Sequence, residues 1–219
     1  MSETAGATAR AATPPRRSAA NWNYIRTAIY WLGAVPAVWT FYLAIADRLG
    51  ADPMKTLEQT LGLWALRFLI VSLAITPLRR MGGPNLLRYR RAFGLLAFFY
   101  ALTHLLVYMV LDQGLDLVAI GRDILKRPYI TIGMAAFLIL LPLAITSNNA
   151  MIRRLGAEGW TRLHKWVYAA AALAAIHFVM VVKSWPPEPL IYAAIVAGLL
   201  LFRLFPQKRK ARTARQRAA

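Results

Sequence analysis

Cysteine is absent from this chain of 219 residues, which excludes disulfides, thiolate-ligated iron–sulfur clusters and thiol redox chemistry. Acidic residues are also scarce, because nine Asp and Glu stand against 27 Lys and Arg and leave a formal net charge of +18. The chain is nevertheless 58% hydrophobic, a fraction that a soluble domain rarely combines with so much charge. This combination predicts apolar membrane spans with the charges confined to the segments between them.

Six apolar runs account for more than half of the sequence and leave no room for a folded soluble domain. Five of them are near the roughly 20 residues that a membrane helix needs, and the last is somewhat short. We therefore predict an all-α integral membrane bundle of six transmembrane helices. The runs are Thr27–Ala46, Leu57–Leu78, Ala92–Leu111, Tyr129–Thr146, His164–Val182 and Pro189–Phe205.

The basic residues are distributed unevenly among the segments that connect these runs. If the N-terminus is placed in the cytoplasm, the cytoplasmic segments hold 20 Lys and Arg and only two acids, Glu3 and Glu158. The segments on the opposite side hold six Lys and Arg together with seven acids. The positive-inside rule therefore predicts both termini in the cytoplasm. Because topology accounts for the charge, the lipid bilayer is an expected partner and nucleic acid is not.

The two ends of the chain differ in composition from the part between them. Residues 1–20 are small, polar and proline-bearing without periodicity, which is typical of a disordered cytoplasmic tail. Residues 207–219 form a strongly basic tail. A six-helix membrane domain over residues 21–206 is expected to carry the function.

Two of the three histidines, His104 and His177, are predicted to lie at the same depth. Each follows the inner end of its span by about a dozen residues, and both spans run in the same direction. Two neutral imidazoles from neighbouring helices at one depth can ligate both axial positions of one haem iron. Gly94, Ala97 and Ala101 share a helix face with His104, and this face leaves space for a macrocycle or serves plain helix packing. The alternative for the histidines is an unrelated, packed pair.

The third histidine, His164, is predicted at the cytoplasmic entrance of the same helix as His177, within the stretch Gly159–Val182. Thirteen residues separate the two imidazoles by roughly 20 Å along a helix axis. The position 13 residues before His104, where a fourth histidine would complete a second pair, is Arg91. His164 is therefore predicted to ligate a second haem whose other axial position holds a non-histidine ligand or is open. The alternative is an interfacial residue that contacts a flavin, a quinone or a propionate.

Arg67 is the one basic residue that lies well inside a predicted span and not at its cytoplasmic end, and a charge without a partner is costly there. A haem propionate is a natural partner for Arg67, and snorkelling towards the outer headgroups is the alternative. Arg90, at the start of the third span, is a second candidate partner for a propionate.

Four ordered segments resemble the MsrQ (YedZ) family, the haem-binding membrane subunits of the MsrPQ methionine sulfoxide reductase system within the ferric-reductase-like transmembrane group. The resemblance covers the chain from about Leu57 onwards. The segments are WALRFLIVSLAITPLRR, RRAFGLLAFFYALTHLLVY, KRPYITIGMAAFLILLPLAITS and LHKWVYAAAALAAIHF.

The resemblance implies a multi-pass protein of a bacterial inner membrane with one or two b-type haems, and with His104, His164 and His177 as iron ligands. It also implies FMN, and electrons that arrive from the quinone pool or a cytosolic flavin reductase. They would leave to a periplasmic, molybdopterin-containing subunit that repairs oxidised methionine, so this chain would not itself be an enzyme. The rival interpretations are a stand-alone ferric or quinone oxidoreductase and a cofactor-free six-helix transporter.

Overall fold

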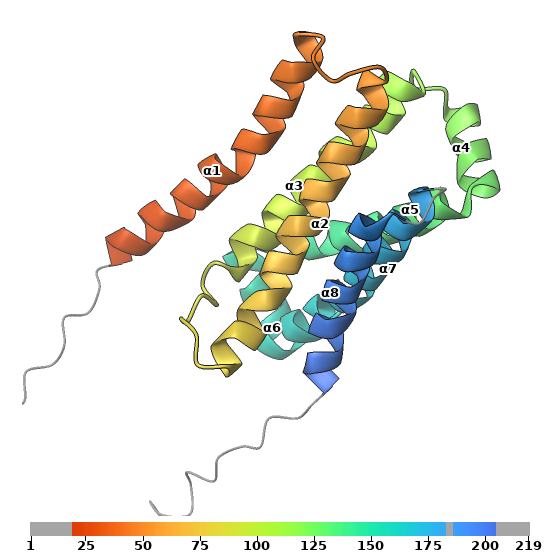
Figure 1. Cartoon of the computed structure of the whole chain (residues 1–219). Coiled ribbons are helices and arrows are strands. Elements are labelled where there is room, and N and C mark those ends of the chain that lie inside the picture. The colour runs from red at the N-terminus through yellow and green to blue at the C-terminus, as the bar shows by residue number, and fades with distance from the viewer. Residues whose placement is uncertain (1–18, 183–185, 205–219) are drawn as a thin grey trace, which may run out of the picture.

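The computed structural model describes residues 19–182 and 186–204, and this part of the chain is helical without any strand (Figure 1). Six helical segments are long and apolar enough to cross a membrane, which confirms the predicted fold class. The elements are, in order, α1 (Ala19–Ile45), α2 (Pro53–Arg80), α3 (Arg90–Leu106), the π-helical segment η1 (Val107–Asp112), α4 (Leu117–Lys126), α5 (Pro128–Ile145), α6 (Asn149–His164), α7 (Val167–Val181) and α8 (Pro187–Leu204).

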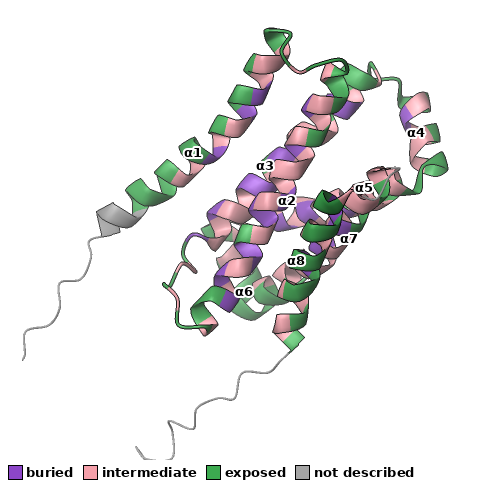
Figure 2. Ribbon diagram, viewed as in Figure 1, coloured by how far each residue is buried: buried purple, intermediate pink, exposed green. Residues whose placement is uncertain are grey.

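The centre of the bundle is built from α2 and α3 on one side and α5 and α7 on the other. Fully buried leucines on α2, including Leu61 and Leu73, pack against α3, and Ala170 and Ala171 of α7 join the same core. Large apolar side chains on the outer surfaces are exposed, as expected of helices that face lipid (Figure 2). The buried residues therefore concentrate where these four helices meet.

Helix α1 lies at one side of the bundle and is tied to α3 by a tyrosine (Figure 1). The Tyr100 hydroxyl accepts a hydrogen bond from the Ala37 amide at 2.9 Å and donates one to the Gly33 carbonyl at 2.7 Å. An α-helix normally joins these two backbone groups to each other. Gly33 also allows close contact, because a Cβ there would lie 2.5 Å from Leu96 Cδ1.

The stretch Gly159–Val182, predicted as one helix, is divided between α6 and α7. His164 ends α6, and tight turns follow in which the Lys165 and Trp166 amides donate to Arg162 and Leu163 carbonyls. The polar segment before His164, which connects two of the predicted spans, is mostly helical and is interrupted at Gly156, whose φ of 70° suits glycine. His164 therefore lies at a helix junction.

The connection between the third and fourth spans contains α4, so the short helix that its length allows is present. Asp116 caps this helix by accepting hydrogen bonds from the Val118 and Ala119 amides. The expected basic tail 207–219, most of the expected disordered tail 1–20 and residues 183–185 lie outside the described residues.

Candidate functional site

The structure brings His104 of α3 and His177 of α7 together near the C-terminal ends of these two helices. Their ring centroids are 6.2 Å apart, and their planes meet at 74°. Both histidines are partly buried among the surrounding helices. The depth match inferred from the sequence therefore corresponds to a side-by-side pair from two helices.

A backbone carbonyl orients each imidazole through the same ring nitrogen. His104 Nδ1 donates to the Glu58 carbonyl of α2 at 2.9 Å, and His177 Nδ1 donates to the Tyr129 carbonyl of α5 at 2.7 Å. A neutral imidazole that donates through Nδ1 carries its free lone pair on Nε2. No hydrogen bond to either Nε2 occurs among the described residues, so both lone pairs are available to a metal.

Glycines on the partner helices bring these carbonyl-bearing helices close to the rings. A Cβ at Gly62 of α2 would lie 3.2 Å from His104 Nδ1, and a Cβ at Gly133 of α5 would lie 2.8 Å from His177 Nδ1. The small-residue face of α3 predicted beside His104 packs against the core and α2. Ala97 is buried in the core, and a Cβ on Gly94 would meet Ser72 of α2, as in plain helix packing.

His164 lies apart from the histidine pair and stacks on Trp160, with ring centroids 3.7 Å apart. Its Nδ1 donates to the Trp160 carbonyl at 3.0 Å, and its Nε2 lies 3.3 Å from Ser147 Oγ. The Ser147 hydroxyl has one proton and donates at 2.7 Å to the Leu143 carbonyl. That proton is not free for His164, so the Nε2 lone pair of the neutral ring lacks a strong donor.

Arg90 and Arg91 lie within electrostatic range of the His164 imidazole. Arg91 donates through Nη1 to Asn149 Oδ1 at 2.9 Å, so the residue at the place of a fourth histidine links α3 to α6. The guanidinium of Arg90 makes no hydrogen bond or ion pair with any described residue. These arginines make the surroundings of His164 positive.

Arg67 contacts the first turns of α8. Its Nε donates to Tyr192 Oη at 2.8 Å, and its Nη2 lies 4.0 Å from Glu188 Oε1. The guanidinium also lies 4.9 Å from the centre of the Trp64 ring. Arg67 therefore has polar and aromatic partners, and those on α8 lie towards its N-terminal end.

Charged residues also flank the N-terminal end of α5, next to the Tyr129 carbonyl that orients His177. Arg127 donates to Tyr129 Oη at 3.2 Å and pairs with Asp123 at 3.4 Å. This hydrogen bond and then the Asp123 charge raise the pKa of Arg127, so its guanidinium stays protonated. Polar contacts between the end of α4 and the start of α5 thus fix this edge of the site.

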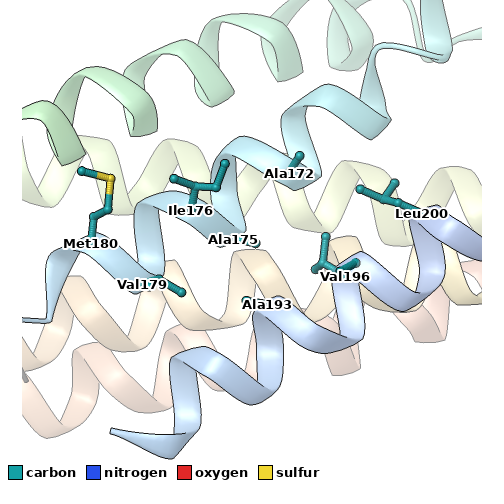
Figure 3. A pocket seen from close by; sticks show the side chains of 9 residues that line it. Ala172, Ala175, Ile176, Val179, Met180, Ala193, Val196 and Leu200 are labelled. Carbon is teal, nitrogen blue, oxygen red and sulfur yellow. The ribbon is translucent and has the colours of Figure 1, made fainter. Parts of the chain in front are cut away.

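The far face of α7 has a groove of about 340 Å³ against α8, and Figure 3 shows its side chains to be aliphatic except for the thioether of Met180. Its one metal-ligating group is the thioether of Met180, whereas the histidine pair on α7 offers two imidazoles and is therefore the better candidate for a redox centre. The groove is lined by Ala172, Ala175, Ile176, Val179, Met180, Ala193, Val196, Ala197 and Leu200.

Comparisons with known proteins agree with this architecture. Residues 61–188 match the protein family described as "Ferric reductase like transmembrane component". The chain is 64% identical to proteins of Brucella ovis, Brucella canis and Brucella suis over 176 residues, 80% of this chain and 80% of each relative. The chain belongs to the MsrQ family. The three relatives carry the name "Protein-methionine-sulfoxide reductase heme-binding subunit MsrQ".

In this MsrQ-family chain, the sequence predicted the pair His104 and His177 but not the backbone groups that orient the two imidazoles. The Glu58 and Tyr129 carbonyls have no side-chain signal in a sequence. Gly62 and Gly133 could have been noticed, because a glycine in an apolar helix often marks close approach by a neighbour. Which neighbour approaches depends on how the helices pair, which one sequence does not reveal.

Proposed function

We propose that this chain is a b-type cytochrome of a bacterial inner membrane in which His104 and His177 ligate one haem iron. The relatives are named as heme-binding subunits, and the histidine pair is the observation that best supports the same role here. Haem would supply a one-electron couple. The chain would carry electrons, while a separate subunit would reduce the sulfoxide.

The spacing of the pair fits one shared metal ion. With imidazole–metal bonds of about 2 Å, two such nitrogens lie about 4 Å apart, and the ring centres lie about 6 Å apart in a linear arrangement. The rings of His104 and His177 have centroids 6.2 Å apart. Their Nδ1 hydrogen bonds would fix tautomer and orientation, the usual role of second-shell groups.

We propose His164 for a second redox centre near the basic end of the bundle. It would ligate a second haem b, or it would contact FMN, a quinone or a propionate. The support is that its Nε2 lone pair lacks a strong donor, while Trp160 holds the ring in place. The positive surroundings provided by Arg90 and Arg91 suit an anionic cofactor group.

Arg90 and Arg67 are the proposed partners of haem propionates. Arg90 is the stronger candidate, because the described residues leave its guanidinium without an acceptor. Arg67 already donates to Tyr192. A carboxylate at Arg67 would share the guanidinium with this contact, whereas one at Arg90 would neutralise an unpaired charge.

The electron donor in this proposal is the quinone pool or a cytosolic flavin reductase, and the acceptor is a periplasmic, molybdopterin-containing methionine sulfoxide reductase subunit. The word "subunit" in the name of the relatives supports an obligatory partner. Without cysteine, the chain has no thiolate with which to hold a molybdenum centre of its own. The proposed role is therefore electron transfer for the repair of oxidised periplasmic proteins.

A reduced-minus-oxidised difference spectrum of the purified protein tests the proposal. We expect a low-spin b-type haem band in the wild type. His104→Ala and His177→Ala should each abolish the same band, because one iron needs both rings. His164→Ala should spare that band and remove a separate signal or slow electron entry. A wild type without b-type haem would refute the function, and retention of the band in either pair variant would refute the pairing.

A further inference from the structure

Three arginines from three helices gather at the basic end of the bundle, and we call Arg80, Arg90 and Arg203 the arginine cluster. Arg203 lies within electrostatic range of both of the others, which are like charges. Its Nη2 donates to the Leu73 carbonyl, and the neighbouring Ser72 hydroxyl donates to the Arg90 carbonyl at 3.2 Å. The guanidinium of Arg80 also lies 5.9 Å from the centre of the Phe202 ring, next to Arg203 in α8. The cluster therefore joins the last turns of α2 and α8 to the first turn of α3 (Figure 1).

Protein contacts hold Arg203 in the cluster without neutralising it. Its Nη1 donates to Tyr168 Oη at 2.8 Å, and its Nη2 donates to the Leu73 carbonyl at 2.8 Å. Its Nε is buried and has no acceptor among the described residues. A buried N–H without an acceptor points to a missing polar partner.

No carboxylate in the described chain compensates the arginine cluster. Seven of the nine acids lie in segments at the opposite end of the spans. Glu158 is exposed and pairs with Arg162 at 3.4 Å, and Glu3 lies outside the described residues. Three neighbouring guanidinium charges without a counter-charge repel one another, so an anion bound between them would stabilise the folded state.

We propose that the arginine cluster binds a phosphate group at the membrane surface. Guanidinium groups match phosphate oxygens with paired hydrogen bonds, and phosphate can carry two charges against three arginines. Basic pockets between transmembrane helices on the positive side of a membrane bind lipid headgroups by this chemistry. The phosphate belongs to an anionic phospholipid or to a soluble phosphate compound. This site is separate from the histidine pair and does not depend on haem ligation there. It shares Arg90 with the propionate contact proposed above, whereas Arg80 and Arg203 belong to the phosphate site alone.

The test measures the Tm of the full-length protein in neutral detergent, with tryptophan fluorescence as the signal for unfolding. Two phosphate probes are added in separate titrations, each with its own control. Phosphatidylglycerol is titrated against phosphatidylcholine, and inorganic phosphate against chloride at equal ionic strength. We expect at least one phosphate probe to raise the wild-type Tm above its control. A rise with phosphatidylglycerol alone assigns the phosphate to a lipid, and a rise with inorganic phosphate assigns it to a soluble compound. No rise with either probe would overturn the proposal.

Arg80→Gln removes one member of the cluster, and Arg79→Gln is the matched control, since Arg79 is an exposed neighbour outside it. Loss of a charged hydrogen-bond donor should raise the probe concentration needed for half of the Tm shift about tenfold in Arg80→Gln. Arg79→Gln should behave like the wild type, and Arg80→Lys should fall between them. Equal responses of Arg80→Gln and Arg79→Gln would refute the site. The haem absorbance of each sample shows separately whether the histidine pair is loaded.

Discussion

At the scale of single residues, the orientation of the two imidazoles of the pair depends on neighbouring glycines without a side chain. Gly62 and Gly133 have no Cβ, so the backbones of α2 and α5 approach the imidazoles closely enough for carbonyls one turn away to accept from Nδ1. The approach is closer at Gly133 than at Gly62, as judged by the space for a Cβ. A larger residue should therefore be tolerated less well at Gly133 than at Gly62.

Gly133→Ala should displace His177, because its new Cβ would lie 2.8 Å from both Cε1 and Nδ1 of that ring. We expect the affinity for haem to fall about tenfold or more, as when an orienting second-shell contact is lost. The measurement is haem retained per polypeptide after purification in detergent. Gly198→Ala in α8 is the control, since nothing lies within 4 Å of a Cβ there. Equal haem retention in both variants would contradict the role of Gly133.

At the scale of helices, individual hydrogen bonds between neighbours replace the hydrophobic driving force that lipid does not provide. Tyr100 joins α3 to α1, Arg67 joins α2 to α8, and Arg203 joins α8 to α2 and α7. Each contact satisfies a group that would otherwise lie in an apolar environment without a partner. Removing any of them should therefore loosen one helix rather than the whole bundle.

Tyr100→Phe should loosen α1, because the Ala37 amide and the Gly33 carbonyl lose their shared partner in the interior. We expect a loss of about 0.5–1.5 kcal/mol, the net contribution of a hydrogen bond, because the two backbone groups can pair with each other once the hydroxyl is removed. The loss is measured as a lower Tm of the full-length protein in detergent. Tyr42→Phe is the control, since Tyr42 is 53% exposed on α1. Equal Tm values for the two variants would show that the Tyr100 hydroxyl contributes nothing.

Arg67 has two proposed partners, and a double-mutant cycle separates them. If its main role is the contact with Tyr192, Arg67→Met and Tyr192→Phe should each lower the Tm. Their effects should then couple by roughly 0.5–3 kcal/mol, as for residues in direct contact. If Arg67 instead contacts a haem propionate, Arg67→Met should shift the haem reduction potential, and Tyr192→Phe should leave that potential unchanged. We expect the coupling, because the structure contains the Arg67–Tyr192 hydrogen bond. Additive effects on Tm would contradict it.

At the scale of the whole molecule, features that depend on one helix at a time could be predicted from the sequence. The six spans follow from length and hydropathy, and the shared depth of His104 and His177 follows from helical rise. Features that depend on helix pairing could not be predicted. The proximity of Ser147 to His164 is one example, because it requires the junction of α6 and α7 and its position against α5.

The orientation of the molecule in the membrane is the prediction on which the proposed direction of electron flow depends. The segments at the end with both termini carry 20 Lys and Arg, whereas the opposite segments carry six and most of the acids. Because basic segments are retained on the cytoplasmic side, a reporter fused after Ala219 should be cytoplasmic, and one fused after Gly114 should be external. Paired reporters, one active only inside the cell and one only outside, measure both positions. An external signal at Ala219 would place His164 and the arginine cluster on the outer side. The histidine pair would then lie nearer the cytoplasm, and the proposed donor and acceptor sides would be exchanged.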